Sequence, residues 1–81
     1  MEIRVTCYSG YRSDESPRRI RLGSRVVAVR EVVDRWLAPD HRYFKCLGDD
    51  GDVYIIRQDM HTLNWELVYF EQREANGGVS Q

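Results

Sequence analysis

The fold is decided by residues 42–70, RYFKCLGDDGDVYIIRQDMHTLNWELVYF, which contain six of the nine aromatic residues of the chain. Polar turns divide this stretch into three runs, and two of the runs are rich in aromatic and β-branched residues, which favour strands. Such runs with polar turns between them are typical of β-hairpins. The stretch therefore predicts two successive hairpins that supply most of the hydrophobic core.

The Asp-Asp-Gly turn at residues 49–51 determines how the first hairpin is paired. A three-residue loop with Gly51 in the left-handed conformation places Gly48 opposite Asp52. A two-residue turn would shift the pairing by one residue and move apolar side chains to the wrong face. We therefore expect the three-residue loop. The apolar residues that then share one buried face are Phe44, Cys46, Tyr54 and Ile56.

Residues 25–37, RVVAVREVVDRWL, allow two interpretations. Apolar residues recur here at helical spacing, but five of the thirteen residues are valine, which prefers strands. The strand interpretation needs a β-bulge near residues 30–31, where the alternation breaks, and a bulge would bend the strand as a small barrel requires. We favour the bent strand, with a helix over 25–37 as the alternative.

Two shorter segments, residues 2–8 and 18–22, alternate between apolar and polar side chains as half-buried strands do. Successive hairpins in a short chain favour a curled sheet, because curling protects edge strands and encloses one core. The prediction is an all-β domain over residues 1–70 with five or six antiparallel strands, in a small SH3-like open barrel or a bent meander. Residues 71–81 lack an apolar period and predict a flexible tail.

Composition places the chain among ordinary globular domains. It has 81 residues, of which 42% are hydrophobic and 31% charged. No run approaches the roughly 20 apolar residues of a membrane helix, and the first residues lack the pattern of a secretion signal. We therefore expect a cytoplasmic protein without a membrane partner, in which Cys7 and Cys46 are reduced thiols on inward faces.

No sequence motif indicates catalysis or a bound cofactor. The two cysteines and two histidines lack zinc-ligand spacing, and the acidic residues at 49–52 lack the ligand set of a calcium loop. A glycine-rich phosphate loop and a nucleophile elbow are also missing. We expect a protein that is not an enzyme and that uses neither metal nor cofactor. Trp36 and Trp65 are expected to be core residues.

Charge is unevenly distributed along the chain. Residues 1–48 carry ten Lys or Arg and six Asp or Glu, a net of +4, whereas residues 49–81 carry two and seven, a net of −5. Eleven of the twelve basic residues are arginine, which suits bidentate and stacked contacts. Aromatic rings beside arginine can stack on bases or hold a peptide. The predicted binding residues are Tyr8, Tyr11, Arg12, Arg18, Arg19, Arg21 and Arg42.

Two binding functions are compatible with this distribution. The first is a protein-binding module that uses the segment 8–22 and an exposed sheet face or edge. The second is a nucleic-acid-binding barrel that uses the arginine-rich half 1–48, although the net charge of −1 argues against it. Arginines gathered on one face without acidic neighbours would favour nucleic acid. Pairing with nearby carboxylates would favour protein; the candidates are Asp14, Glu15, Asp34 and Asp40.

The order of several short motifs resembles an uncharacterised group of small bacterial proteins over about residues 8–70. The matching positions are Pro17, Ile20, Gly23, a valine-rich strand ending at Trp36, the run Arg42-Tyr43-Phe44, Asp50-Gly51, Tyr54, Asp59 and Trp65-Glu66-Leu67. The group usually has an aromatic residue where this chain has Ile20. Its members are expected to be cytoplasmic and have no assigned activity. The resemblance therefore implies an all-β fold and a strand over 25–37, but no catalytic residue.

Overall fold

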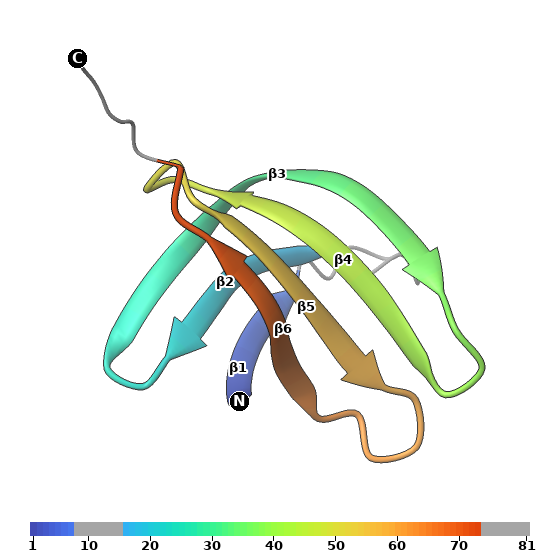
Figure 1. The fold of residues 1–81 in the computed structure, drawn as a ribbon. Coiled ribbons are helices and arrows are strands. Elements are labelled where there is room, and N and C mark those ends of the chain that lie inside the picture. The colour runs from blue at the N-terminus through green and yellow to red at the C-terminus, as the bar shows by residue number, and fades with distance from the viewer. Residues whose placement is uncertain (8–15, 74–81) are drawn as a thin grey trace.

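The computed structural model describes residues 1–7 and 16–73, which form six antiparallel strands and no helix. The strands are β1 (Glu2–Cys7), β2 (Pro17–Leu22), β3 (Arg25–Leu37), β4 (His41–Gly48), β5 (Val53–Asp59) and β6 (Trp65–Glu71). Each strand pairs with the next, and β1 pairs with β6 (Figure 1). The all-β prediction is confirmed, and the helical alternative for residues 25–37 is excluded.

The barrel is closed, whereas the sequence predicted an open barrel or meander. The closing seam is short: Glu2 pairs with Glu66 and Ile3 with Trp65, and the N–H of Leu67 donates to the carbonyl of Met1 at 2.8 Å. At these residues closure covers the edges of β1 and β6 at which another chain could pair. The seam joins the first and last strands of the chain. Hairpin patterns predict pairing only between strands that follow each other in sequence, so the sequence did not predict this closure.

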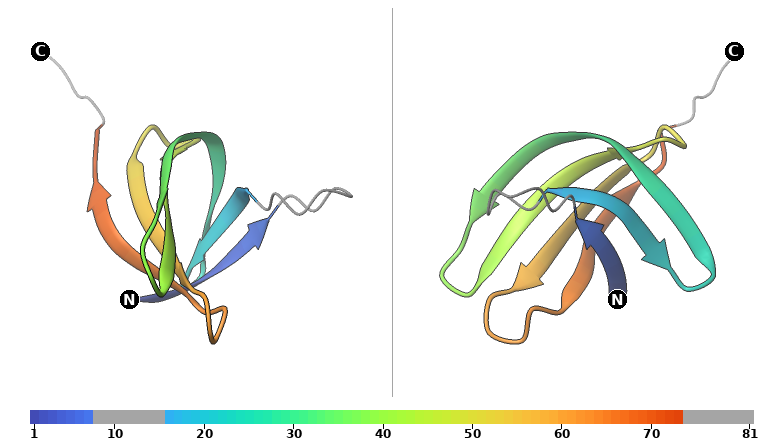
Figure 2. Two further views of the ribbon diagram at one scale, coloured as in Figure 1. Left: turned by 90° about the vertical axis from the view of Figure 1, so that its right-hand side faces the viewer. Right: turned by 180° about the vertical axis from the view of Figure 1, so that it is seen from behind.

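Strand β3 connects the two halves of the barrel. Its first part pairs with β2 and its second part with β4, and Figure 2 shows it arching between them. Two β-bulges interrupt its pairing with β4, at Arg30 and at Val33. The bulge predicted near residues 30–31 is confirmed. Because bulges bend and twist a strand, these two allow one long strand to pair with β2 at its start and with β4 over the rest of its length.

The β4–β5 hairpin has the predicted register. The N–H of Gly48 donates to the carbonyl of Asp52 at 2.8 Å, and Gly51 has a φ of 87°. Phe44 pairs with Ile56 and Cys46 with Tyr54, and all four side chains are buried. The other buried members of the same core cluster are Ile3, Ile20, Val27 and Trp65.

The two tryptophans lie in different environments. Trp65 is 8% exposed and belongs to the core, as predicted. The prediction that Trp36 is a core residue is wrong: it is 40% exposed and pairs with Tyr43. A single bulge at Arg30 would leave Trp36 pointing inward. The second bulge adds Val33, which reverses the alternation and turns the indole outward.

The C-terminal boundary of the barrel differs slightly from the prediction. Strand β6 ends at Glu71, one residue into the segment 71–81 that was predicted as a tail. Two residues further on, the backbone N–H of Arg73 donates to the buried side chain of Asp52 at 3.1 Å. Residues 74–81 of the predicted tail lie outside the described residues.

Candidate functional site

The seven predicted binding residues do not form one site. Tyr8, Tyr11 and Arg12 lie outside the described residues. Strand β2 carries three of the others, and β4 carries the last, which is Arg42. Strand β3 separates β2 from β4 in the barrel, so Arg42 belongs to a different surface. The residues on β2 are Arg18, Arg19 and Arg21.

Arg19 and Arg21 share the outer face of the β1–β2 ribbon with Arg4. Arg4 pairs directly with Arg21, and Thr6 pairs with Arg19. We call the three exposed residues Arg4, Arg19 and Arg21 the Arg face. Among the residues that the structure describes, no ion pair joins them to a carboxylate. The predictions omitted Arg4, although its outward position in the alternating first strand could have indicated it.

A second surface lies where β3 ends and β4 begins. It is a groove of about 320 Å³, mostly apolar in its lining. We call it the Trp36 groove. Leu37, which is 81% exposed, stands at its rim. The residues that line it are Arg35, Trp36, Leu37, Arg42, Tyr43 and Phe44.

An aromatic stack lies on the outer face of the β3–β4 pair, and both of its residues are among those that line the Trp36 groove. The rings of Trp36 and Tyr43 are 5.3 Å apart and nearly parallel, with an interplanar angle of 6°. The hydroxyl of Tyr43 accepts a hydrogen bond from Arg57 at 3.4 Å, and Glu66 holds Arg57 through an ion pair of 2.7 Å. These contacts run across four strands and keep the stack in place before any ligand arrives.

Phe44 also lines the Trp36 groove, but its side chain lies on the inner face of the β3–β4 pair, opposite to the face of Trp36 and Tyr43. It is buried and packs against Trp65, with ring centroids 5.7 Å apart. The guanidinium carbons of Arg35 and Arg42 lie 5.7 and 5.5 Å from the Phe44 centroid, within cation–π distance. The Nε of Arg42 also donates to the buried Gln58 at 2.8 Å. The groove thus combines apolar surface with two positive charges at defined positions.

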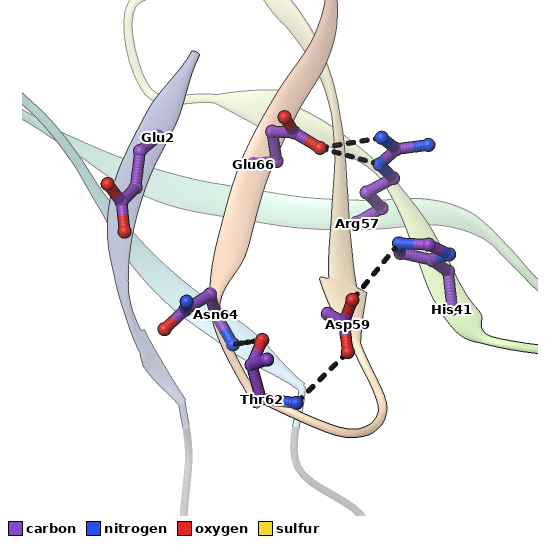
Figure 3. Close-up of a pocket in the computed structure, with 7 residues that line it drawn as sticks. All are labelled: Glu2, His41, Arg57, Asp59, Thr62, Asn64 and Glu66. Carbon is purple, nitrogen blue, oxygen red and sulfur yellow. Dashed lines mark hydrogen bonds and ion pairs between the residues drawn. The ribbon is translucent and has the colours of Figure 1, made fainter.

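A larger hollow of about 410 Å³ is lined by polar residues of β1, β4, β5, β6 and the β5–β6 turn (Figure 3). There His41 lies 3.7 Å from Asp59. Asp59 also accepts a hydrogen bond from the backbone N–H of Thr62, which holds the pKa of that carboxyl below its usual value. Arg57 is paired with Glu66. Because these groups bind one another and fasten the turn, we assign this hollow a structural role.

The described residues do not suggest metal or thiol chemistry. They contain no group of three or more His, Cys, Asp or Glu side chains that could hold a metal ion. Cys7 and Cys46 are thiols and are not joined in a disulfide. Burial raises the pKa of the Cys46 thiol to about 12, which disfavours the reactive thiolate. Within the same residues, no helix is long and apolar enough to span a bilayer.

Comparison with known proteins supplies no assignment. No protein-family model, curated protein or solved structure matches the chain. The resemblance to a group of small bacterial proteins therefore stays a prediction. Function is inferred instead from the geometry of the Trp36 groove and the Arg face.

Proposed function

We propose that this protein is a non-catalytic, cytoplasmic protein-binding module that holds an extended peptide in the Trp36 groove. The observation that carries the proposal is the exposed Trp36 stacked on Tyr43, in a groove that two arginines also line. Tryptophan, tyrosine and arginine are the residue types that dominate the energetics of protein interfaces. Here they line one groove at the end of the β3–β4 pair, with the two rings on its outer face and the two arginines on its inner face beside Phe44.

The chemistry of the groove indicates the class of peptide. The flat stack of Trp36 and Tyr43 suits a proline ring or an aliphatic side chain, as in other aromatic-lined peptide grooves. The positive charges of Arg35 and Arg42 would attract an acidic residue of the ligand. A volume of about 320 Å³ accommodates one or two side chains. The proposed ligand is an extended segment with an acidic residue beside a proline or aliphatic residue.

This proposal moves the protein-binding site away from the predicted segment 8–22. Of the predicted residues, Arg42 lines the groove. The closed barrel also weakens the idea that a partner adds a strand to the sheet, because β1 and β6 occupy each other's edges near Ile3 and Trp65. Peptide capture in a groove is the mode that the surface favours.

A peptide selection tests the proposal. Short random peptides displayed on phage would be selected on the wild-type protein and depleted on the Trp36→Ala variant. The enriched peptides should share an acidic residue beside proline or an aliphatic residue. A labelled synthetic version should lose about tenfold in affinity, or about 1.4 kcal/mol, when Trp36 or Arg42 is truncated.

The matched control truncates an apolar residue outside the groove. Val68 is also exposed but lies on β6 and does not line the groove, so Val68→Ala should leave peptide affinity unchanged. Circular dichroism would check that each variant is folded. The proposal fails if no peptide is enriched, or if the enriched peptides bind Trp36→Ala as tightly as the wild type.

A further inference from the structure

We infer that the Arg face is a second binding surface and that it holds the phosphate backbone of a nucleic acid. The Arg face lies on the β1–β2 ribbon, which Figure 2 shows on a different side of the barrel from the β3–β4 turn beside the Trp36 groove. The two surfaces share no residue. The inference therefore goes beyond the proposed function and does not depend on it.

The pairing of Arg4 with Arg21 is the first observation. The two residues are directly opposite each other on neighbouring strands and point to the same outer face. Like charges in this arrangement destabilise a sheet. No carboxylate among the described residues forms an ion pair with either one. An anion bound between them would remove the repulsion.

The shape of the face is the second observation. One hollow of about 260 Å³ is lined by Arg4, Thr6, Arg19, Arg21 and Val26, and another of about 310 Å³ by Glu2, Ile3, Arg4, Arg21 and Gly23. The Arg4–Arg21 pair lines both hollows, so they adjoin along the ribbon. Proteins that bind single-stranded nucleic acid use a basic groove of this kind to track the phosphate backbone.

The spacing along the ribbon agrees with a chain of phosphates. Arg19 and Arg21 are two residues apart on β2 and point the same way, which separates them by about 6.8 Å. Consecutive phosphates of an extended nucleic-acid strand are separated by a similar distance. Each guanidinium can bind one phosphate through two hydrogen bonds. Arg19 and Arg21 would then contact consecutive phosphates, and Arg4, which lies opposite Arg21, would share the phosphate of Arg21.

Two features favour nucleic acid over an anionic membrane surface. Among the residues lining the two hollows, Val26 is the one large apolar side chain that is exposed, whereas surfaces that insert into a membrane interface present an extended apolar face. Glu2 lines the second hollow together with Arg4 and Arg21, and its carboxylate would repel an anion there. The negatively charged surface of a membrane would face Glu2 as well as the arginines, so Glu2 would oppose its binding.

The test uses the full chain and fluorescence anisotropy with a labelled oligothymidine and a labelled duplex of about 20 nucleotides or base pairs, at about 50 and 200 mM salt. Two phosphate contacts predict that affinity falls about 7-fold between these salt concentrations for the single strand and about 12-fold for the duplex. The triple variant Arg4→Gln, Arg19→Gln, Arg21→Gln should lose both the binding and its salt dependence. The two probes show which form of nucleic acid the face prefers.

The matched control is Lys45→Gln. It removes the same charge as a single arginine substitution but lies on β4, across the barrel from β1, and should leave oligonucleotide affinity unchanged. Arg4→Gln alone should weaken binding while the protein unfolds at an equal or higher urea concentration, because the substitution removes the repulsion from Arg21. A structural role for Arg4 would instead lower the unfolding midpoint.

Three results would overturn the inference. One is the absence of oligonucleotide binding at the lower salt concentration, and another is binding that the triple variant retains. The third is arginine-dependent binding to vesicles of phosphatidylserine and phosphatidylcholine without oligonucleotide binding, which would identify a membrane surface. Trp36→Ala should not change oligonucleotide affinity, so this test and the peptide selection fail independently.

Discussion

The two turns that flank β5 reach the same backbone conformation with different residue types. Each contains a residue in the left-handed region: Gly51 in the β4–β5 turn, with a φ of 87°, and Leu63 in the β5–β6 turn, with a φ of 67°. Glycine adopts this conformation freely, whereas a residue with a side chain is destabilised by about 1–2 kcal/mol. The first turn is relaxed, and the second is strained.

One carboxylate organises the β4–β5 turn. Asp50 accepts hydrogen bonds from the hydroxyl of Tyr54 at 2.6 Å, from Arg25 at 2.8 Å and from the N–H of Asp52 at 3.0 Å. Burial opposes ionisation of this carboxyl, but these three partners outweigh it and hold the pKa of Asp50 below its usual value. Because Arg25 begins β3, the network also connects β3 to the β4–β5 hairpin.

The β5–β6 turn displays an apolar side chain instead. Leu63 is 59% exposed, and its carbonyl accepts a hydrogen bond from the buried Gln58 at 3.1 Å. Gln58 in turn accepts the hydrogen bond from Arg42 beneath the Trp36 groove. Backbone strain gathers at functional sites, where the surrounding structure enforces it. One end of the barrel is thus organised for stability, whereas the strained end adjoins the proposed peptide site.

The largest effect is expected at the relaxed end, for Gly48→Ala. A Cβ atom at Gly48 would lie 2.5 Å from Asp50 Oδ1 and 2.7 Å from Val27 Cγ1. Overpacking of this kind should lower the free energy of unfolding by about 3 kcal/mol in urea denaturation. The control is Gly23→Ala: a Cβ there meets nothing within 4 Å, so only the left-handed φ should matter, at about 1 kcal/mol. Equal losses would contradict the prediction.

Tyr54→Phe should have the next largest effect, about 2 kcal/mol, because it removes a buried hydroxyl that donates to a charged group. The depressed pKa of Asp50 stabilises the fold above the usual value of 3.8 and loses this effect as the pH falls through the depressed value. The difference between wild type and variant should therefore shrink from about pH 7 to about pH 3. If the difference does not change with pH, the stabilising effect of Tyr54 does not depend on the ionisation of Asp50.

At the strained end, Leu63→Gly should stabilise the protein by about 1 kcal/mol, because glycine relieves the left-handed conformation. Little burial is lost, since the side chain is exposed. Leu63→Ala serves as the control: alanine keeps the Cβ atom and should give no such gain. If thermal unfolding shows the same midpoint for both variants, the turn is not strained and the contrast between the two turns fails.

The smallest effect on stability, about 0.5 kcal/mol, is expected for Trp36→Ala, which removes an aromatic stack at the surface. Truncation of the buried Trp65 should cost about 4 kcal/mol by comparison. Urea denaturation of the two variants measures both values. A loss at Trp36 that approaches the loss at Trp65 would mean that the indole supports the barrel and is not displayed for a ligand.

Features governed by neighbours in sequence were predictable. The Asp-Asp-Gly turn imposes its own register, so the pairing of Phe44 with Ile56 results from local turn chemistry. The bulge at Arg30 was also visible, as a break in alternation within one strand. For the candidate sites, the outward arginines of β2 and Arg42 were recognised by residue type, but the surfaces to which they belong were not.

The sequence by itself determined the all-β class, the β4–β5 register and the buried face of the core, because these depend on side-chain alternation and turn residues within short segments. Only the tertiary structure decided three other features. The β1–β6 seam joins distant segments, and it closes the barrel. The second bulge, at Val33, depends on how β3 runs beside β4, and it turns Trp36 outward. The partnership of Arg4 with Arg21 exists only once β1 and β2 are paired. Both proposed sites therefore depend on pairings between strands, which no single segment encodes.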